Sequence, residues 1–256
     1  MRVTWEEIER LFSGMLGNSQ DDVVGLFHGP PGTSKTHTAT HMGLQPGEPI
    51  WLLSLSEEQL AAELRGTWMP NEQGGAGWFD GPCVKWWKEG GRLILDELDK
   101  VSADADSFLR VVLNDADVAF LTLPTGETVR KNPSPRWKHS VVATMNGTPE
   151  DLSEALRNRL LPAFEITVPH PGAFLTLPEQ YRAPARAAFK TQDAERYVSL
   201  REWQKFSKLV VGMGDEDLAA RAVLGDFGPG FVDSLKLARG GDATTEEVPS
   251  ENSEEN

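Results

Sequence analysis

The sequence is poor in cysteine and has no long apolar run. Cys83 is the single cysteine among 256 residues, so the chain cannot form an internal disulfide, and a reducing cytoplasm is the simplest setting for it. No apolar stretch approaches the ~18 residues that a membrane-spanning helix needs. The first residues, MRVTWEEIERLF, lack the layout of a secretory signal. We therefore expect a cytoplasmic protein that does not enter the membrane.

Basic residues are also scarce. The sequence has 25 Lys and Arg residues against 39 Asp and Glu residues, which gives a formal net charge of −14. This balance argues against broad, nonspecific binding to nucleic acid or anionic lipid, although it is compatible with a local basic groove. Part of the excess lies in residues 241–256, which hold six acidic and no basic residues. Their low hydrophobicity and high charge predict a disordered acidic tail.

The order of apolar segments predicts an α/β fold. Short apolar runs that read as buried strands occur at residues 23–29, 49–56, 91–98, 140–146 and 163–168. Buried strands separated by helical patterns are typical of a parallel sheet that is covered on both faces. After the PHPG sequence that ends at Gly172, only helical spacing remains. We therefore expect a core domain over residues 1–170 and a small helical domain over residues 171–240.

Three local patterns add detail to this outline. Apolar spacing predicts a helix over residues 4–15, where Thr4 and Glu7 fit a capping box. A second helix is expected over residues 57–64, followed by a glycine-rich segment at residues 66–82. Residues 118–132 alternate around a Thr-Gly turn, which predicts a β-hairpin.

The stretch GPPGTSKT, residues 29–36, follows the first predicted strand and precedes a helix. Such a turn forms an anion site, because backbone N–H groups point inward and the helix N-terminus adds partial positive charge. Lys35 is then expected to reach the β- and γ-phosphates of a nucleotide, and the Thr36 hydroxyl to bind Mg²⁺. The alternative is a Gly-Pro turn that carries a lysine by chance.

Ser34 departs from the strict phosphate-loop pattern, which has glycine before the lysine. Ser34 lies where the loop enters the helix, so we expect an ordinary negative φ that does not need glycine. We also expect its hydroxyl to accept a hydrogen bond from a free N–H group of the first helical turn.

Polar residues follow two of the other predicted strands. Asp96 and Glu97 end the run LILDE, and Asn146 ends ATMN. Ligands bind at the carboxyl ends of strands in open α/β sheets. Asp96 is placed to hold Mg²⁺ through water, Glu97 to orient or activate the water that attacks the γ-phosphate, and Asn146 to bond the γ-phosphate or that water. The alternative for Asp96 and Glu97 is a solvated strand end that carries two acids, and the alternative for Asn146 is an asparagine in a turn.

Three arginines suit phosphoryl charge, because a guanidinium is always ionised and offers a planar fork of donors. Arg157 and Arg159 lie in the short helical segment SEALRNRL. Arg201 lies just after Ser199, which forms a capping box with Glu202. A cation in the first helical turn opposes the helix dipole, and an anionic partner such as ATP would account for it. The alternative for all three is an exposed surface arginine.

Two further pairs resemble functional sites but are better explained by packing. His37 and His41 are four residues apart, as a metal pair would be, yet no further ligand cluster accompanies them. Trp86 and Trp87 could offer a stacking platform, but aromatic residues beside a buried strand belong more often to a core or an interface.

Together these motifs resemble an AAA+ ATPase, and within that group the MoxR branch, which includes the CbbQ and NorQ activases. The resemblance covers residues 20–240 and rests on GPPGTSKT, on ELRGTW followed by WFDGP, and on KEGGRLILDEL, VVATMNGTP, ALRNRL and VSLREW. It implies a P-loop NTPase core with a parallel five-stranded sheet, followed by a helical lid. Gly147 is a departure, since relatives often have proline there.

The resemblance also assigns roles to residues. It implies that Walker B spans residues 93–97, that Asn146 is sensor 1 and that Arg201 is sensor 2 on the lid. The resemblance implies that Arg159, or else Arg157, is the arginine finger that enters the neighbouring subunit's ATP site. The residues around the nucleotide are Gly29, Pro30, Pro31, Gly32, Thr33, Ser34, Lys35, Thr36 and His37.

For the whole protein, the resemblance implies a chaperone-like machine that hydrolyses Mg-ATP. Such family members form hexameric rings and remodel or activate client proteins, often through a partner with a von Willebrand factor A domain. The alternatives are a subunit of a nucleic-acid-processing or GTP-dependent motor, and a nucleotide switch that does not hydrolyse. The net charge counts against the first alternative, and the pair of Asp96 and Glu97 counts against the second.

Overall fold

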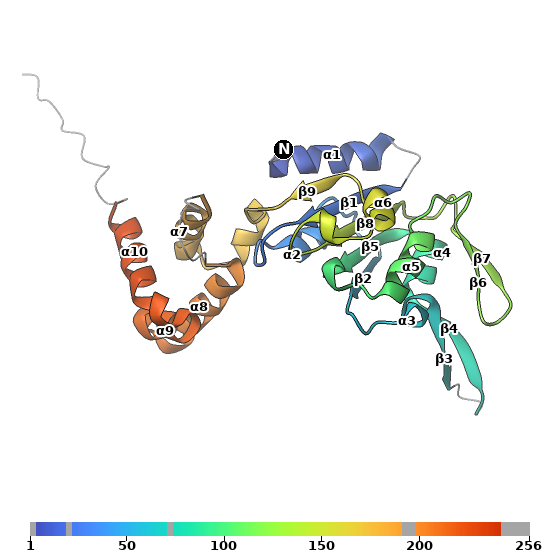
Figure 1. Ribbon diagram of the computed structural model, residues 1–256. Helices are drawn as coiled ribbons and strands as arrows, with labels where there is room; N and C mark the ends of the chain where they lie inside the picture. Colours follow the sequence, from blue (N-terminus) through green and yellow to red (C-terminus); the bar gives the residue numbers. More distant parts are fainter. Residues whose placement is uncertain (1–3, 19–21, 71–73, 191–197, 242–256) are drawn as a thin grey trace, which may run out of the picture. The chain divides into compact units, whose positions relative to one another are not determined.

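The computed structural model describes residues 4–18, 22–70, 74–190 and 198–241. The chain divides into two compact units, Met1–His170 and Pro171–Asn256 (Figure 1). The first unit is built around a β-sheet, whereas the described part of the second is helical. None of the helices in the described ranges is long and apolar enough to span a membrane.

The first unit contains a five-stranded sheet in which every pair of neighbouring strands is parallel. The strand order is β2-β5-β8-β1-β9. The strands are β1 (Val23–His28), β2 (Ile50–Ser54), β5 (Gly91–Asp96), β8 (His139–Thr144) and β9 (Ala163–Glu165). The predicted parallel sheet is therefore confirmed. Because β1, β5 and β8 lie side by side, the residues that follow them meet at one edge of the sheet.

One face of the sheet is covered by α1 (Trp5–Asn18) and by α2 (Lys35–Ala39). Ile8 and Phe12 of α1 pack there with Ile94 and Val142 of the sheet. The capping box of α1 forms as expected, since Thr4 N donates to Glu7 Oε2 and Glu7 N donates to Thr4 Oγ1. This face thus holds the helix that follows the glycine-rich loop.

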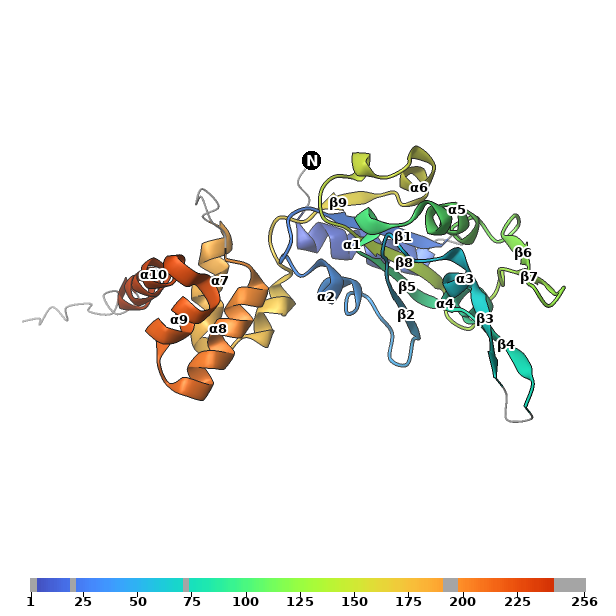
Figure 2. The same cartoon turned by 60° about the horizontal axis from the view of Figure 1, so that its bottom comes forward.

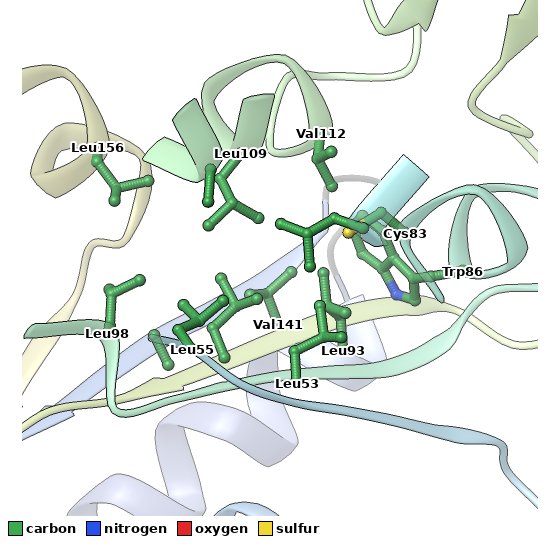
Figure 3. Close-up of a cluster of buried hydrophobic side chains, with 14 of the residues drawn as sticks. Leu53, Leu55, Cys83, Trp86, Leu93, Leu98, Leu109, Val112, Val141 and Leu156 are labelled. Carbon is green, nitrogen blue, oxygen red and sulfur yellow. The ribbon is translucent and has the colours of Figure 1, made fainter. Parts of the chain in front are cut away.

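Four helices pack against the opposite face: α3 (Ala61–Arg65), α4 (Pro82–Glu89), α5 (Ala103–Val112) and α6 (Glu154–Arg159). Figure 3 shows apolar side chains of α4, α5 and α6 above Leu93 and Val141 of the sheet. Trp86 and Trp87 of α4 are fully buried in this unit, which confirms that they belong to the core. The free thiol of Cys83 is buried in the same cluster.

The helix α3 starts later than the sequence predicts, at Ala61 and not at residue 57. A turn precedes it, in which Gln59 N donates to Ser56 O. Ser102 Oγ donates to Gln59 O at 2.6 Å, and Ala61 N donates to Asp104 Oδ2 at 2.7 Å. These bonds to α5 and its N-cap stabilise the turn, so the local helical spacing does not extend through it.

Two antiparallel hairpins project from the first unit (Figures 1 and 2). The strands β6 (Phe120–Thr122) and β7 (Thr128–Arg130) form the hairpin that the Thr-Gly turn predicts. The strands β3 (Gly66–Pro70) and β4 (Ala76–Asp80) form a second hairpin in the glycine-rich segment, where the sequence predicts no strands. Short 3-10 helices, η1 (Leu98–Lys100) and η2 (Pro149–Asp151), follow β5 and β8.

The second unit is helical in its described part, as its spacing predicts. Its elements are η3 (Pro171–Thr176), α7 (Glu179–Lys190), α8 (Leu200–Met213), α9 (Glu216–Leu224), η4 (Gly225–Phe227) and α10 (Gly228–Gly241). The capping box of α8 is confirmed, because Ser199 N donates to Glu202 Oε2 and Glu202 N donates to Ser199 Oγ. The acidic tail predicted for residues 241–256 lies outside the described residues, apart from Gly241 at the end of α10.

Candidate active site

The loop between β1 and α2 has the backbone geometry of an anion cradle. Gly29 and Gly32 have φ values of 127° and 78°, and Ser34 follows with 63°. A side chain at Gly29 would clash, since its Cβ would lie 2.6 Å from Ile166 O. Among the described residues, no protein acceptor receives a hydrogen bond from the backbone N–H groups of residues 32–36. A run of free N–H groups at a helix start fits a bound phosphate.

Ser34 does not adopt the conformation that we expected from the sequence. It has φ 63° and ψ 29°, in the left-handed region, and its side chain makes no capping hydrogen bond. Both expectations for Ser34, a negative φ and a capping hydroxyl, are therefore wrong. The loop needs a left-handed residue here to turn the N–H groups inward, and serine adopts this conformation at an energetic cost that glycine would not incur.

Lys35, the first residue of α2, turns back over the loop. Its Nζ donates to Gly29 O at 3.0 Å and to Pro30 O at 2.8 Å. It also donates to Asn146 Oδ1 at 3.1 Å. Burial lowers the pKa of Lys35 to about 8, although the nearby carboxylates of Asp99 and Asp96 oppose this shift. In the part of the chain that the structure describes, no carboxylate pairs directly with this buried ammonium group, which suits a site that receives an anion.

Thr36 and Asp96 are in direct contact. Thr36 Oγ1 donates to Asp96 Oδ1 at 2.8 Å. The same carboxylate oxygen accepts a hydrogen bond from Thr144, the last residue of β8. A hydroxyl and a carboxylate are oxygen ligands of the kind that Mg²⁺ prefers. The donor set therefore fits a magnesium ion held between the loop and the end of β5.

Glu97 follows Asp96 in a strained conformation. Its φ is 57°, and in the described residues only Ser34 and Glu97 combine a side chain with a positive φ. Such strain is concentrated at functional sites, where the surrounding structure enforces it. The Glu97 carboxylate is exposed and pairs with Lys100 at 2.8 Å, and this bond raises the pKa of Lys100. The backbone thus directs Asp96 and Glu97 to different partners.

Asn146 joins the site from the segment after β8. Its Oδ1 accepts from Lys35, and its N–H donates to Asp99 Oδ1 at 3.0 Å. Gly147 has φ 84°, which proline cannot adopt because its ring fixes φ near −65°. Proline could therefore not replace Gly147 here without a change in the backbone.

Two of the predicted arginines lie on α6 of the first unit, and the third lies on α8 of the second unit. Arg159, at the end of α6, donates to Asn114 Oδ1 and to Ala155 O. No hydrogen bond or ion pair of the Arg157 side chain is found within the described ranges. Arg201 is exposed in the first turn of α8, in the second unit. Within the first unit, the structure thus brings together the loop, Asp96 and Asn146, and neither Arg157 nor Arg159 contacts them among the described residues.

His37 and His41 stack on each other, with ring centroids 4.2 Å apart. Burial lowers the pKa of His37, and His41 and His170 add to this effect. No group of three His, Cys, Asp or Glu side chains with a metal-binding arrangement occurs in the part of the chain that the structure describes. The two rings thus pack against each other.

Sequence reasoning missed Asp99 and Thr144. Asp99 accepts from Asn146 N and opposes the fall in the pKa of Lys35, and Thr144 donates to Asp96. Both lie within three residues of a predicted site residue. Their position at the same two strand ends is the signal that could have found them.

The comparisons with known proteins agree with this geometry. A family model for the AAA domain of the dynein-related subfamily matches residues 25–160. The chain belongs to this AAA family. The match begins in β1 and ends just after α6, so it includes the loop, both strand ends and both arginines of α6.

Curated relatives place this AAA+ domain in the MoxR branch, as the motifs predict. Protein NorQ of Paracoccus denitrificans is 27% identical over 155 residues, which are 59% of this chain and 55% of NorQ. The denitrification regulatory protein NirQ of Stutzerimonas stutzeri is 31% identical over 108 residues, 42% of this chain and 38% of NirQ. The AAA+ chain therefore spans about half, or less, of the length of these relatives.

Two more distant similarities were found for the AAA+ chain. Midasin of Giardia intestinalis is 31% identical over 140 residues, 53% of this chain and 3% of midasin. A crystal structure of a protein from Cytophaga hutchinsonii has a TM-score of 0.47 at 17% identity, and covers 80% of this chain and 57% of that one.

Proposed function

We propose that this AAA+ chain binds Mg-ATP at the loop of residues 29–36 and hydrolyses it. The observation that carries this proposal is the contact of Thr36 with Asp96, beside a buried Lys35 and a run of N–H groups that have no acceptor among the described residues. The N–H groups and Lys35 hold the phosphates, and Thr36 and Asp96 hold Mg²⁺. When bound, Mg²⁺ neutralises charge on the phosphate oxygens.

Glu97 and Asn146 act on the water that attacks the γ-phosphate. The Glu97 carboxylate first leaves its exposed partner Lys100. It then binds the attacking water and either orients this water or accepts a proton from it. Asn146, whose backbone N–H is held by Asp99, presents its side-chain amide to the γ-phosphate or to this water. Lys35 exchanges Asn146 Oδ1 for a phosphate oxygen when the nucleotide enters.

Hydrolysis takes place in a ring of copies of this chain, with six as the expected number. Arg159 of one subunit stabilises the transition-state charge at the ATP site of the next, and such an arginine contributes several kcal/mol. Arg201 contacts the nucleotide from the lid. An exposed arginine in the first turn of α8, against the helix dipole, supports an anionic partner there.

The ring uses this cycle to remodel or activate a client protein. Similarity to NorQ, and to NirQ, a protein named as a denitrification regulator, supports an activase over a metabolic enzyme. A partner with a von Willebrand factor A domain is the expected adaptor for the client.

Phosphate release from Mg-ATP tests the proposal, with the mass of the particle measured in the same samples. We expect turnover that rises with protein concentration as rings form, and none in Lys35→Ala. If Lys35→Ala released phosphate as fast as the wild type, the loop would not be the site of hydrolysis. Full turnover by a monomer would exclude the ring.

A further inference from the structure

Asn114 binds the guanidinium group of Arg159. It lies just after α5, and its Oδ1 accepts from Arg159 Nε at 3.1 Å and from Arg159 Nη2 at 3.0 Å. Arg159 Nη1 donates to Ala155 O at 2.9 Å. A guanidinium group has five N–H donors in one plane. These bonds fix that plane and use three donors, which leaves two N–H groups for a ligand outside the subunit.

Asn114 is itself held by its main chain. Its carbonyl oxygen accepts from Lys131 Nζ at 3.0 Å. The Lys131 side chain is fully buried, pairs with Asp22 and lies 4.8 Å from the centre of the Trp86 ring. Lys131 directly follows β7, at the base of the β6–β7 hairpin. The acceptor for Arg159 is therefore attached to the core and not to a mobile surface turn.

The other end of α6 is fastened to α5 as well. Ser153, the N-cap of α6, donates to Asp106 Oδ1 at 2.8 Å, and Asp106 also pairs with Arg110. A helix of six residues is too short to be stable alone. Bonds at both ends, to Asp106 of α5 and to Asn114 just after α5, therefore set the position of α6 and of the arginine at its end.

We propose that Asn114 is a positioning residue for ATP hydrolysis in the neighbouring subunit, because it fixes the plane of Arg159 before the ring assembles. This inference rests on the proposed function, in which Arg159 acts in trans. Displacement of a catalytic group by about 1 Å can cost about 100-fold in rate. Asn114 thus contributes to turnover without touching a nucleotide.

The test compares Asn114→Ala, Asn114→Asp and Asn158→Ala. Asn158 is exposed on the same helix and serves as the matched control. For Asn114→Ala we expect kcat to fall about 10-fold, with KM for ATP unchanged and rings still formed. Asn114→Asp retains an oxygen acceptor for Arg159, and so it should keep near-normal kcat, as should Asn158→Ala.

Mixed rings separate this role from a merely structural one. Asn114→Ala subunits have an intact ATP site, whereas Glu97→Gln subunits have an intact Arg159. At equal amounts, about half of the Asn114→Ala sites face an intact arginine, so turnover per Asn114→Ala subunit should rise about fivefold after a 10-fold loss. A mixture of Arg159→Ala and Glu97→Gln subunits, in equal amounts, is the reference for the extent of rescue.

The outcomes distinguish the inference from the function on which it rests. Rescue of Arg159→Ala without rescue of Asn114→Ala, or normal kcat in Asn114→Ala alone, would overturn the role of Asn114 and leave the proposed function intact. Failure of both mixtures would overturn the action of Arg159 in trans, and with it this inference. Rescue of both supports the positioning role.

Discussion

The Thr36 hydroxyl donates to Asp96 Oδ1 at 2.8 Å, and this bond joins α2 to the end of β5. The two residues are 60 positions apart in the sequence, and the parallel register of β5, β8 and β1 brings them together. Thr144 at the end of β8 donates to the same carboxylate oxygen. The candidate magnesium ligands are thus aligned by the sheet before any ligand binds.

Asp96→Asn should weaken Mg²⁺ binding more than nucleotide binding. The amide loses the negative charge but keeps the size of the side chain, so the ATP complex should need about 10-fold more Mg²⁺. Titration of Mg²⁺ against a fluorescent ATP analogue measures this. The control is Thr40→Val, at the C-cap of α2, and this variant should have the wild-type Mg²⁺ requirement. An unchanged Mg²⁺ requirement in Asp96→Asn would contradict the assignment.

Ser34→Gly should retain ATPase activity and make the folded chain more stable. Serine with φ 63° has a steric cost that glycine avoids. We therefore expect the substitution to raise the free energy of unfolding by up to about 1 kcal/mol. Chemical denaturation measures the change. The same substitution at Ser107, inside α5, should lower stability by about 0.5 kcal/mol. A destabilised Ser34→Gly would show that the hydroxyl has a role of its own.

ATP binding should weaken as the pH rises from 7 to 9. The pKa of Lys35 is lowered to about 8 by burial, so the free site loses its ammonium charge over this range. A bound phosphate favours the charged form, and binding at pH 9 must therefore take up a proton. We expect affinity to fall about 10-fold between pH 7 and pH 9.

Titration calorimetry at pH 9, in two buffers with different heats of ionisation, detects the proton uptake. Lys35→Met removes the titrating group, and its residual affinity should not change with pH. An affinity that stays constant in the wild type, without proton uptake, would refute the role of Lys35 charge.

Arg159→Ala should lower kcat by about 10³-fold and leave ATP affinity unchanged. Arg157→Ala should retain most of its activity, because Arg157 is the alternative finger and not the one that Asn114 positions. Phosphate release and nucleotide titration on rings of verified mass give both values. The reverse pattern, with loss only in Arg157→Ala, would exchange the two roles.

The sequence predicts the site where short patterns encode it. Apolar runs that end in Asp96 and Asn146 indicate strand ends, and parallel strands bring such ends to one edge, so the contact of both with the loop residues could be expected. Thr144 and Asp99 follow no distinct pattern, because a threonine or an acid near a strand end is common. Their roles depend on the register of the strands, which the sequence does not specify.

Backbone conformation and distant contacts are harder to predict. Ser34 has a left-handed backbone that its residue type does not predict. Glycine at this position would have indicated a positive φ, whereas serine usually indicates a negative one. The bond between Asn114 and Arg159 joins residues 45 positions apart, and neither residue lies in a pattern that indicates the other. The hairpin of β3 and β4 was missed because its glycine-rich segment lacks clear alternation.

Phosphate release by Glu97→Gln tests most directly whether this chain hydrolyses ATP with Glu97 acting on the attacking water. The amide cannot accept a proton, so turnover should fall at least about 10²-fold. Nucleotide titration of the same variant should give wild-type affinity, since Lys35 and the loop are intact. Normal phosphate release by a Glu97→Gln protein that binds ATP would contradict the account.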